Sequence, residues 1–385
     1  MNFKTIDNFN FWGKRVLVRA DLNSPVSSKG KVLMNDRIEE SARTLKELKM
    51  EGARVVVLAH QSRPGEKDFI SLKQHAKLLS KFVKVKFIKD MIWKNAVEEI
   101  KKLKMGEVLL LENIRFEKDE FKPSVNNKIV KTLAPLFDYY VNDAFSVCHR
   151  NETSIVSFPE VLPSCAGRLM ENELNHLDKI KVGNCLFVLG GAKMDEIISL
   201  IDGKRKVLAG GLLGPLILFA NGQKFGKMDK LLMGQKKYFR KLKNPKNVVP
   251  AVDYAFDISG KRKEMMLDEL PCKYDVLDIG KKSIEIFVKE IKKVKCIFVK
   301  GPQGKYEDAQ FSKGTREVLK AVVRSKAFSV LGGGHTENAL KELGFSRKDF
   351  SYVSLSGGAT VKYIFGKKLV GMEVMNRGSC IFKHV

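Results

Sequence analysis

The chain has 385 residues, of which 44% are hydrophobic and 30% charged, and this length and balance indicate a soluble globular protein of two domains. No apolar run approaches the roughly 20 residues of a membrane span, the N-terminus lacks the apolar core of a signal peptide, and the six scattered cysteines argue against zinc sites and disulfides and for a reducing cytoplasm. The net charge of +26 invites a nucleic-acid role, but most of the 70 basic residues are lysines spread over helices, and no nucleic-acid motif accompanies them.

The first half of the chain alternates apolar, strand-like runs with amphipathic helical patterns. Uninterrupted apolar strands between helices indicate a parallel sheet covered on both faces, and such sheets bind ligands at the C-terminal ends of their strands. Asp36, with Glu39 three residues later, resembles the N-cap of the first helix. The pattern predicts strands at residues 15–20, 54–59, 85–88, 108–111 and 139–141, and helices at about 36–50, 72–82, 95–104 and 127–137.

Polar side chains follow four of these strands and form a candidate anion site. Arginine suits such a site because its fork binds carboxylate and phosphate oxygens in pairs. A single arginine is more often a surface residue or a helix cap, but four near corresponding strand ends favour a binding role. A structural role for His60 is as plausible as a ligand role. The candidates are Asp21 and Asn23 after the first strand, His60 and Arg63 after the second, Arg115 and Arg150 after two later strands, and Arg37 at the start of the first helix.

The second half follows a small-residue break at Ser164–Arg168 and a helical pattern at Leu169–Ile180, which we interpret as the connector between two domains. Residues 244–273 are irregular and suit a short antiparallel piece. The rest of the second half again alternates apolar runs with helical patterns, which predicts a second parallel α/β domain. Its expected strands are 185–189, 206–209, 276–279, 296–299, 328–331 and 352–355, and its expected helices are about 195–201, 213–220, 230–242, 283–293, 315–325 and 336–343.

Glycine turns end several strands of this second half. Gly332–Gly334 separate an apolar run from the helical pattern that begins at Thr336. Glycines let the backbone approach a ligand closely, and the unpaired N–H groups at a helix start favour a phosphate. One such turn is a weak signal, but similar turns occur at Gly190–Gly191 before Lys193, at Gly210–Gly211 and at Gly357–Gly358. The repetition predicts a phosphate site at this sheet edge.

The motifs, taken together and in order, resemble the phosphoglycerate kinase family over nearly the whole chain. The histidine that follows the three glycines is similar to the archaeal branch of that family. The motifs are RADLNSP, HQSRP, LLLENIRF, YVNDAFSVCHR, GRLMENELNHL, LGGAK, KGPQGKYE, LGGGHT and SLSGGAT.

The resemblance implies an α/β fold of two doubly wound, Rossmann-like parallel-sheet domains joined by a helix, with an open cleft between them. The expected N-terminal domain, residues 1–165, binds 3-phosphoglycerate, and the tail at 371–385 packs back on it. Residues 166–181 form the connecting helix, and residues 182–370 form the nucleotide-binding domain.

The resemblance also implies an activity. A phosphoryl group passes in line between 1,3-bisphosphoglycerate and ADP after hinge closure, giving 3-phosphoglycerate and ATP in glycolysis and gluconeogenesis. The implied cofactor is Mg²⁺, bound mainly through the nucleotide phosphates. The expected partners are these substrates, with no membrane and no dedicated nucleic acid, and the expected state is a cytoplasmic monomer or dimer.

Site residues follow from the resemblance position by position. The glycerate substrate is expected at Asp21, Asn23, Arg37, His60, Arg63, Arg115 and Arg150. The nucleotide is expected at Lys193, Gly210, Gly211, Pro302, Glu307, Gly332, Gly333, Gly334 and Thr336. Arg37 and Lys193, with the amides of Gly333 and Gly334, are expected to stabilise charge on the transferring group. No general base is required, because the acceptor is already a carboxylate or a phosphate.

Four features depart from the family pattern on the nucleotide side, and one of them is that the usual third glycine run appears as Ser356-Gly357-Gly358. Many family members carry a second lysine four residues after the one that matches Lys193, but here that position is Ile197. Lys204 and Lys305 are candidates to supply the missing phosphate contact, because they lie nearby in the sequence. The family commonly has an aspartate after the three glycines, but here that residue is His335. A neutral imidazole does not replace a carboxylate as a ligand of Mg²⁺, which prefers oxygen. The family usually has an asparagine before the Gly-Pro pair, but here that residue is Lys300.

Two alternative functions remain open. One is a related protein with weakened catalysis, which Ile197 and His335 favour and the complete arginine cluster opposes. The other is a nucleic-acid binder driven by charge, which would bind in a salt-dependent way without competition from ATP or 3-phosphoglycerate. A generic P-loop enzyme is disfavoured because the chain contains no GxxxxGK[ST] motif.

Overall fold

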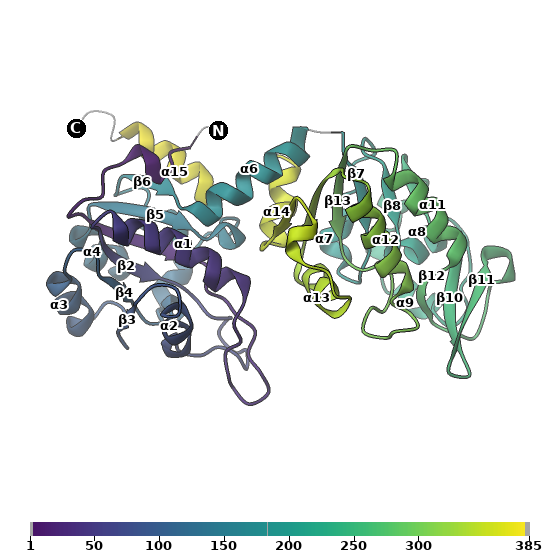
Figure 1. Cartoon of the computed structure of the whole chain (residues 1–385), viewed down its shortest axis with the longest axis horizontal. Helices are drawn as coiled ribbons and strands as arrows, with labels where there is room; N and C mark the ends of the chain where they lie inside the picture. The colour runs from purple at the N-terminus through teal and green to yellow at the C-terminus, as the bar shows by residue number, and fades with distance from the viewer. Residues whose placement is uncertain (1–2, 183, 382–385) are drawn as a thin grey trace. The chain divides into compact units, whose positions relative to one another are not determined.

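The structure, a computed structural model, describes residues 3–182 and 184–381, with the side chains of 181, 182 and 377–381 left aside. The chain divides into two compact units (Figure 1). Unit 1 comprises Met1–Asn175 with Lys367–Val385, and unit 2 comprises His176–Gly366. The helix α6 (Arg168–Val182) begins among the residues of unit 1 and ends among those of unit 2. No helix of the described ranges is long and apolar enough to cross a membrane.

Unit 1 contains a six-stranded parallel sheet with the order β3-β4-β2-β1-β5-β6. Successive side chains of a strand point to opposite faces, so Val16 and Val18 of β1 join one hydrophobic core while Leu17 joins the other. The sheet is therefore buried on both faces, as its apolar sequence predicts. The strands are β1 (Arg15–Ala20), β2 (Arg54–Leu58), β3 (Lys86–Phe87), β4 (Val108–Leu110), β5 (Tyr139–Asp143) and β6 (Ser164–Ala166).

The helices of unit 1 lie over the two faces of this sheet (Figure 1). They are α1 (Asp36–Met50), α2 (Lys73–Leu79), α3 (Lys94–Lys102), α4 (Lys128–Leu133), α5 (Thr153–Val156), the first part of α6, and α15 (Val370–Ile381). Short 3₁₀ turns occupy Ile6–Asn8, Ile114–Phe116, Lys118–Phe121, Ala134–Leu136 and Phe145–Val147. The expected helix at 127–137 is thus shorter than predicted: it stops at Leu133, and a 3₁₀ turn containing Pro135 follows.

The C-terminal helix α15 packs on unit 1. The Gly371 N–H donates to the Cys148 carbonyl at 3.0 Å, and a Cβ at Gly371 would lie 2.7 Å from Ile155. Val370 and Val374 join the small core around Ile155. A helix was not expected here, and residues 382–385 of the predicted tail lie outside the described residues.

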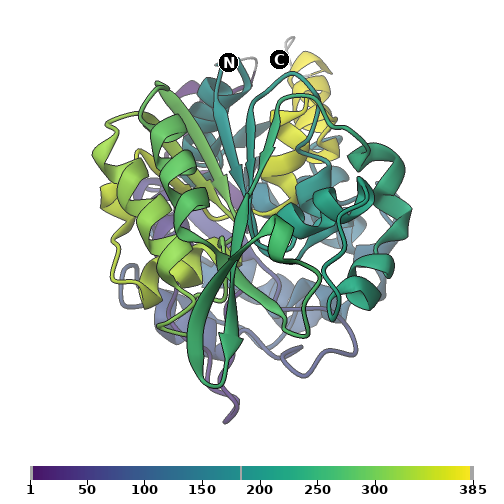
Figure 2. The same ribbon diagram turned by 90° about the vertical axis from the view of Figure 1, so that its right-hand side faces the viewer.

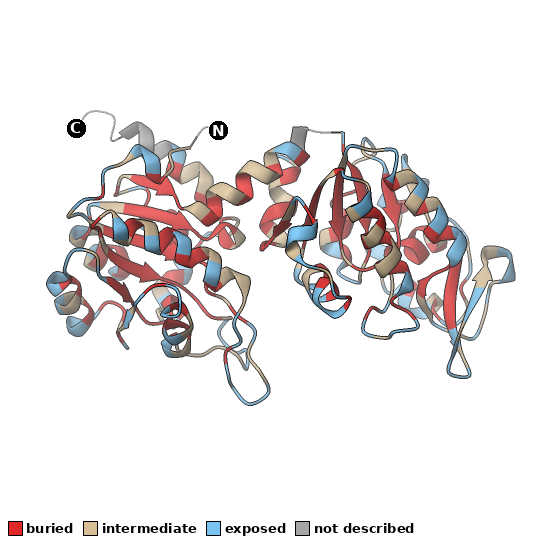
Figure 3. Cartoon of the chain, in the orientation of Figure 1, coloured by how far each residue is buried: buried red, intermediate tan, exposed pale blue. Residues whose placement is uncertain are grey.

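Unit 2 contains a second six-stranded parallel sheet, with the order β15-β14-β13-β7-β8-β9. Figure 2 faces this unit and shows helices on both sides of the sheet, drawn in green on one side and teal on the other. Figure 3 shows that the central strands of both sheets are largely buried, whereas the edge strands β3 and β9 are only partly buried. The strands of unit 2 are β7 (Leu186–Leu189), β8 (Val207–Ala209), β9 (Val248–Pro250), β13 (Cys296–Lys300), β14 (Phe328–Gly332) and β15 (Tyr352–Ser354).

The helices of unit 2 include one that the sequence pattern did not predict, α14. They are α7 (Met194–Ile198), α8 (Leu213–Ala220), α9 (Asp229–Met233), α10 (Phe239–Leu242), α11 (Lys281–Ile291), α12 (Lys313–Arg324), α13 (Gly334–Glu342) and α14 (Gly358–Ile364). Single 3₁₀ turns occupy Lys236–Tyr238, Leu267–Glu269 and Arg347–Asp349. The single helix predicted at 230–242 is wrong, because the chain there forms α9, a 3₁₀ turn and α10, with Gly234 at the break.

A separate antiparallel sheet, with the order β11-β10-β12, belongs to unit 2. Its strands are β10 (Asp253–Ile258), β11 (Lys261–Met266) and β12 (Val276–Ile279). The hairpin of β10 and β11 confirms the antiparallel piece expected within 244–273. The placement of 276–279 in the parallel sheet is wrong, because β12 pairs antiparallel with β10. Likewise the small-residue break at Ser164–Ala166 is a strand, β6, which pairs with β5.

Two further local expectations are corrected. Cys185 and Cys296 form a disulfide that joins the starts of β7 and β13, so the expectation of no disulfides is wrong. Scattered spacing did not reveal this pair because the two cysteines come together only when the strands align in register. The N-cap of α1 is Asn35 rather than Asp36: the Asn35 side chain accepts a hydrogen bond from the Ile38 N–H at 3.2 Å.

Candidate active site

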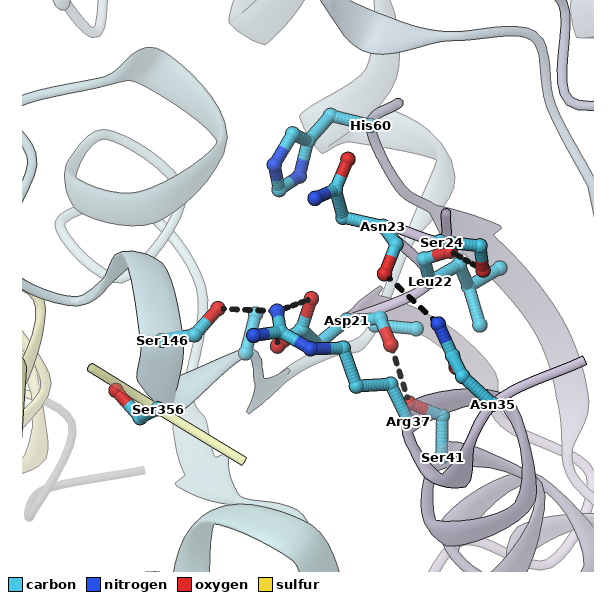
Figure 4. Close-up of polar contacts among 12 residues, drawn as sticks. Asp21, Leu22, Asn23, Ser24, Asn35, Arg37, Ser41, His60, Ser146 and Ser356 are labelled. Carbon is cyan, nitrogen blue, oxygen red and sulfur yellow. Dashed lines mark hydrogen bonds and ion pairs between the residues drawn. The ribbon is translucent and has the colours of Figure 1, made fainter. Parts of the chain in front are cut away.

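Arg37 lies at the C-terminal end of β1, where the first turn of α1 brings it. Its Nη1 donates to the two carboxylate oxygens of Asp21 at 2.9 and 2.8 Å and to the Ser146 hydroxyl at 3.2 Å (Figure 4). The Asp21 side chain is almost completely buried, whereas that of Arg37 keeps 24% of its surface exposed. A buried carboxylate is stable only when it is paired, so Asp21 fixes one face of the guanidinium.

His60 follows β2 and contacts Arg19, a fully buried arginine within β1. The Arg19 Nη2 lies 3.0 Å from His60 Nδ1. Burial lowers the pKa of His60 well below its usual value, and the charges of Arg19, Arg115, Arg37 and Arg150 lower it further. The ring is therefore neutral near pH 7. Because Nδ1 accepts from Arg19, the single proton lies on Nε2, which makes His60 a hydrogen-bond donor through that atom.

Arg115 and Arg150 share one carboxylate, that of Glu152. The Arg115 Nη2 lies 2.7 Å from Glu152 Oε1, and the Arg150 Nη1 lies 3.5 Å from the same atom. Arg115 also donates to the Ser62 carbonyl at 2.6 Å. Burial lowers the pKa of Arg115 to about 10, opposed by Glu152 and assisted by repulsion from Arg19 and Arg150. Two guanidiniums on one carboxylate leave an excess of positive charge.

Asn23 and Arg63 differ in how firmly they are held. The Asn23 Oδ1 accepts from the Ser62 N–H at 2.8 Å, and its side chain lies beside His60 in Figure 4. Arg63 is exposed on the loop after His60, and among the described residues no hydrogen bond or ion pair of its side chain is found. The structure therefore gathers Arg37, Arg115 and Arg150 around His60 and leaves Arg63 on the surface.

Net charge distinguishes this edge of unit 1, which we name the arginine rim: Arg19, Asp21, Asn23, Arg37, His60, Arg115, Arg150 and Glu152. Three of its guanidiniums, those of Arg37, Arg115 and Arg150, are paired with only two carboxylates, those of Asp21 and Glu152. The fourth, that of Arg19, contacts the Ser154 hydroxyl, the Ala20 carbonyl and His60. Burial, assisted by this excess of positive charge, lowers the pKa of His60 and keeps its ring neutral. An anion with several oxygens would therefore be stabilised here.

In unit 2 the glycine turns lock into one another by backbone contacts. The Gly191 N–H donates to the Pro302 carbonyl at 2.7 Å, and the Gly211 N–H donates to the Gln303 carbonyl at 2.9 Å. A Cβ at Gly190 would lie 2.2 Å from the Pro302 carbonyl oxygen, and one at Gly210 would lie 2.1 Å from Gln303 Oε1. These glycines are required by the close approach of the loops after β7, β8 and β13.

Two neighbouring cavities open above these turns. The phosphate-type cavity, of about 90 Å³, is lined by two lysines, several glycine turns and the start of α13. Among its lining residues are Lys193, Lys300, Glu196, Ile197, Gly332, Gly333, Gly334, His335 and Thr336. The apolar cavity, of about 410 Å³, is lined by Leu212, Met228, Leu231, Val276 and Leu277 together with Gly211, Pro302, Lys305 and Glu307. Gly191, Ala192 and His335 line both cavities.

The predicted nucleotide residues divide between these cavities. Among the described residues, Gly210 lines neither cavity. A side chain at this position would collide with Gln303, so the glycine allows Gln303 to pack there. Thr336 is buried, with its hydroxyl donating to the Gly332 carbonyl at 2.9 Å and accepting from the Gly301 N–H at 2.8 Å. Thr336 therefore holds two turns together rather than presenting a free hydroxyl.

Within the phosphate-type cavity, position 197 carries an apolar side chain and position 300 carries a lysine. Ile197 is 2% exposed and belongs to the hydrophobic interior. Lys300, the last residue of β13, is 5% exposed and its Nζ lies 2.8 Å from Glu196 Oε2. Lys204 is not among the residues described as lining this cavity, and Lys305 lines the apolar cavity.

A magnesium ion finds few protein ligands in this unit. Within the described residues no group of three or more His, Cys, Asp and Glu side chains could hold a metal. Glu196 is the carboxylate in the phosphate-type cavity, and its partner there is Lys300. Mg²⁺ commonly keeps its waters and binds through substrate phosphates, so this donor set fits a metal that arrives with a nucleotide.

Sequence reasoning missed several residues of these edges: Arg19, Glu152, Glu196 and Gln303. A charged residue inside an otherwise apolar strand was the available signal for Arg19, because such a residue is rarely buried without partners. The only sign in the sequence that Glu152 belongs to this site is that it is a carboxylate two residues after Arg150. Glu196 and Gln303 carried no signal in the sequence, since their contacts join separate loops.

Comparison with known proteins gives one consistent family. The sequence model described as "Phosphoglycerate kinase" matches residues 6–367. The phosphoglycerate kinase of Methanothermus fervidus is 37% identical over 399 residues, covering 97% of each chain, and that of Methanopyrus kandleri is 38% identical over 397 residues with the same coverage. The solved phosphoglycerate kinase of Pyrococcus horikoshii OT3 superposes with a TM-score of 0.88 at 32% identity, covering 98% of this chain and 100% of that one. The chain therefore belongs to the phosphoglycerate kinase family and is a phosphotransferase.

Proposed function

We propose that unit 1 binds the glycerate substrate and unit 2 binds the nucleotide in the reaction of this family, the reversible conversion of 1,3-bisphosphoglycerate and ADP into 3-phosphoglycerate and ATP. The single observation that carries the first assignment is the excess of guanidinium groups around His60 in the arginine rim. 3-Phosphoglycerate carries a carboxylate and a phosphate, so both of its ends suit bidentate arginines.

Within unit 1 we assign substrate contacts to Asn23, Arg37, His60, Arg63, Arg115 and Arg150, with Asp21 orienting Arg37. His60 acts as a neutral donor through Nε2. Arg63, exposed beside the rim, is free to turn toward the outer end of the substrate. The acceptor oxygen already carries charge, so unit 1 binds and orients rather than abstracting a proton.

Within unit 2 we assign the base and ribose to the apolar cavity, where Gly211, Pro302 and Glu307 lie. The phosphates occupy the phosphate-type cavity, near Lys193 and the N–H groups of Gly333 and Gly334 at the start of α13. Gly210, Gly332 and Thr336 support this site by shaping the turns. Because two cavities share Gly191 and His335, one ligand with an apolar end and an anionic end would fill both.

Catalysis in this proposal is electrostatic. Phosphoryl transfer needs aligned oxygens and positive charge on the moving group, and little covalent chemistry from the protein. Arg37 supplies that charge from unit 1, and Lys193 with the Gly333 and Gly334 amides supplies it from unit 2. Mg²⁺, when bound through the nucleotide phosphates, would neutralise developing charge. Neither unit holds both sets of groups, so transfer requires both units to act on one pair of substrates by hinge closure.

The same reaction places the enzyme in glycolysis and gluconeogenesis, and we propose a cytoplasmic location and a monomeric or dimeric state. The Cys185–Cys296 disulfide must then form inside a cell. Stable intracellular disulfides are known mainly in hyperthermophiles.

A coupled assay of 3-phosphoglycerate-dependent ATP consumption with Mg²⁺ tests the proposal. Wild-type protein is expected to turn over, and Arg37→Ala and Lys193→Ala are each expected to lose most of that turnover. Binding of 3-phosphoglycerate without turnover would show that unit 1 kept its role while unit 2 changed. Failure to bind either substrate would overturn the assignment.

A further inference from the structure

Lys300 lines the phosphate-type cavity from the end of a sheet strand. It is the last residue of β13, which lies between β14 and β7, and it pairs in register with Gly332 on one side and Leu189 on the other. The glycine turns after both neighbouring strands therefore flank it. A Cβ built on Gly333 would lie 3.3 Å from the Lys300 Nζ. The ammonium thus lies directly beside the turn to which we assign the nucleotide phosphates.

The ammonium of Lys300 is buried but incompletely paired. An ammonium has three N–H donors, and among the described residues its one charged partner is the Glu196 carboxylate at 2.8 Å. The lysine is 5% exposed, yet its Nζ end borders a cavity large enough for several water molecules. A buried cation with donors directed at an open cavity is a binding group for an anion.

Glu196 is the movable member of the pair. Its side chain keeps 36% of its surface exposed, against 6% for Lys300, and it lies on α7, a helix of only five residues. A Cβ on Gly357 would lie 3.6 Å from its Oε2, so the carboxylate stands at the cavity wall. Glu196 can turn toward water while Lys300 stays fixed by the strand.

We propose that Lys300 binds the terminal phosphate of the nucleotide, and that Glu196 holds this ammonium until the phosphate displaces it. This inference rests on the assignment of the nucleotide to unit 2. The cavity thereby keeps two ammonium groups, Lys193 from the loop after β7 and Lys300 from β13, although position 197 is an isoleucine of the hydrophobic interior. Lys300 and Glu196 form an internal ion pair that exchanges for an ammonium–phosphate pair.

The test is a set of calorimetric titrations with ATP, ADP and adenosine, all without Mg²⁺ so that a metal does not confuse the role of Glu196. The proteins are wild type, Glu196→Gln, Lys300→Met, the double variant, and Lys204→Met as an exposed lysine control. The double variant is necessary because Lys300→Met alone leaves the Glu196 carboxylate to repel phosphate.

The expected results have opposite signs for the two members of the pair. Glu196→Gln removes the internal competitor and should tighten ATP and ADP by roughly threefold to tenfold. Adding Lys300→Met to Glu196→Gln should weaken ATP by roughly tenfold to a hundredfold, the range for a lost charge-assisted contact. Adenosine should change by less than about twofold in every variant, since it carries no phosphate, and Lys204→Met should match wild type.

Three outcomes would overturn the inference. Equal ATP affinity in Glu196→Gln and in the double variant would mean that Lys300 only neutralises Glu196. Equal weakening of ATP and adenosine in a folded Lys300→Met protein would mean a structural role. Weaker ATP binding by Glu196→Gln would show that Glu196 does not compete. Failure of wild type to bind adenosine and ATP would instead reject the nucleotide assignment itself, so the two failures are distinguishable.

Discussion

In unit 1 the polar edge of the sheet consists of charged side chains that hold one another in place, whereas in unit 2 the corresponding edge consists mainly of interlocked backbone turns. Arg37 rests on Asp21, and Arg115 on Glu152, while Gly191 and Gly211 bond to carbonyls of the loop after β13. The difference teaches that two similar parallel sheets can offer different chemistry: one edge depends on ionisation, and the other on the absence of Cβ atoms.

Among the variants that test this comparison, Arg37→Ala is expected to have the largest effect, a loss of catalytic rate. Loss of a charge that stabilises the transferring group typically lowers kcat by roughly 10²–10³. Arg63→Ala is the matched control, because Arg63 is exposed. For Arg63→Ala we expect a KM for 3-phosphoglycerate raised by less than about tenfold at unchanged kcat. Steady-state kinetics at saturating ATP measures both. Equal loss of kcat in the two variants would break the distinction between held and exposed arginines.

The disulfide of unit 2 is expected to have the next largest effect. Cys185 and Cys296 enclose a sequence separation of 111 residues, and cross-links of that kind stabilise by about 2–4 kcal/mol. Cys296→Ser should lose that stability in urea unfolding, and wild type with reductant should match it. Cys272→Ser, at a free cysteine, is the control. The bond joins the strand starts, opposite the glycine turns, so adenosine binding should persist. Six free thiols in the unreduced wild type would contradict this account.

Glu120 makes the stability of unit 1 depend on pH. Burial raises the pKa of this carboxyl to about 7, opposed by Arg19 and by hydrogen bonds from Ser154. The native state therefore binds a proton that the unfolded state has released, and this contribution to stability is present below the unfolded pKa and is lost as pH rises through the folded pKa. Between about pH 4.5 and 7 wild type should lose about 2–3 kcal/mol relative to Glu120→Gln.

Urea unfolding of wild type and Glu120→Gln at a series of pH values measures that difference, and other titrating groups cancel in it. A difference that stays constant with pH would mean that the ionisation of Glu120 does not couple to folding.

The glycine turns of unit 2 give the smallest predicted change, and it is one of stability. Gly190→Ala places a Cβ 2.2 Å from a backbone oxygen of Pro302, so the loops must separate, at about 1–3 kcal/mol. Gly334→Ala, whose Cβ would meet nothing within 4 Å, should fold as stably as wild type. Thermal unfolding compares the two variants. If Gly190→Ala were as stable as wild type, close backbone packing would not explain this edge.

Much of the fold could be predicted because apolar strands alternate with helices along the chain. β1 and α1 have the predicted bounds, since an unbroken apolar run and an amphipathic helix each carry their own signal. β6 was not predicted, because Ser164–Ala166 is short and made of small residues. The direction of β12 was also missed: a four-residue strand does not encode its partner, and β10 supplies it.

The site was predictable where chemistry lies at strand ends and not where it depends on counter-charges. Arg37, Lys193 and the Gly332–Gly334 turn lie where strand and helix patterns meet, so the sequence places them. The partners that fix the charged groups come from distant loops. Glu152 joins Arg115 across 37 residues, and Glu196 joins Lys300 across more than a hundred. Only the folded register brings those pairs together.

The most direct test of the comparison is a crossed pair of binding titrations. Calorimetry would measure 3-phosphoglycerate and ADP separately on Arg150→Ala and on Lys193→Ala. We expect Arg150→Ala to weaken the binding of 3-phosphoglycerate by roughly tenfold or more and to leave the affinity for ADP within about twofold of wild type. For Lys193→Ala we expect the reverse. If Arg150→Ala weakened ADP instead, or if each variant weakened both ligands equally, the assignment of one substrate to each unit would be contradicted.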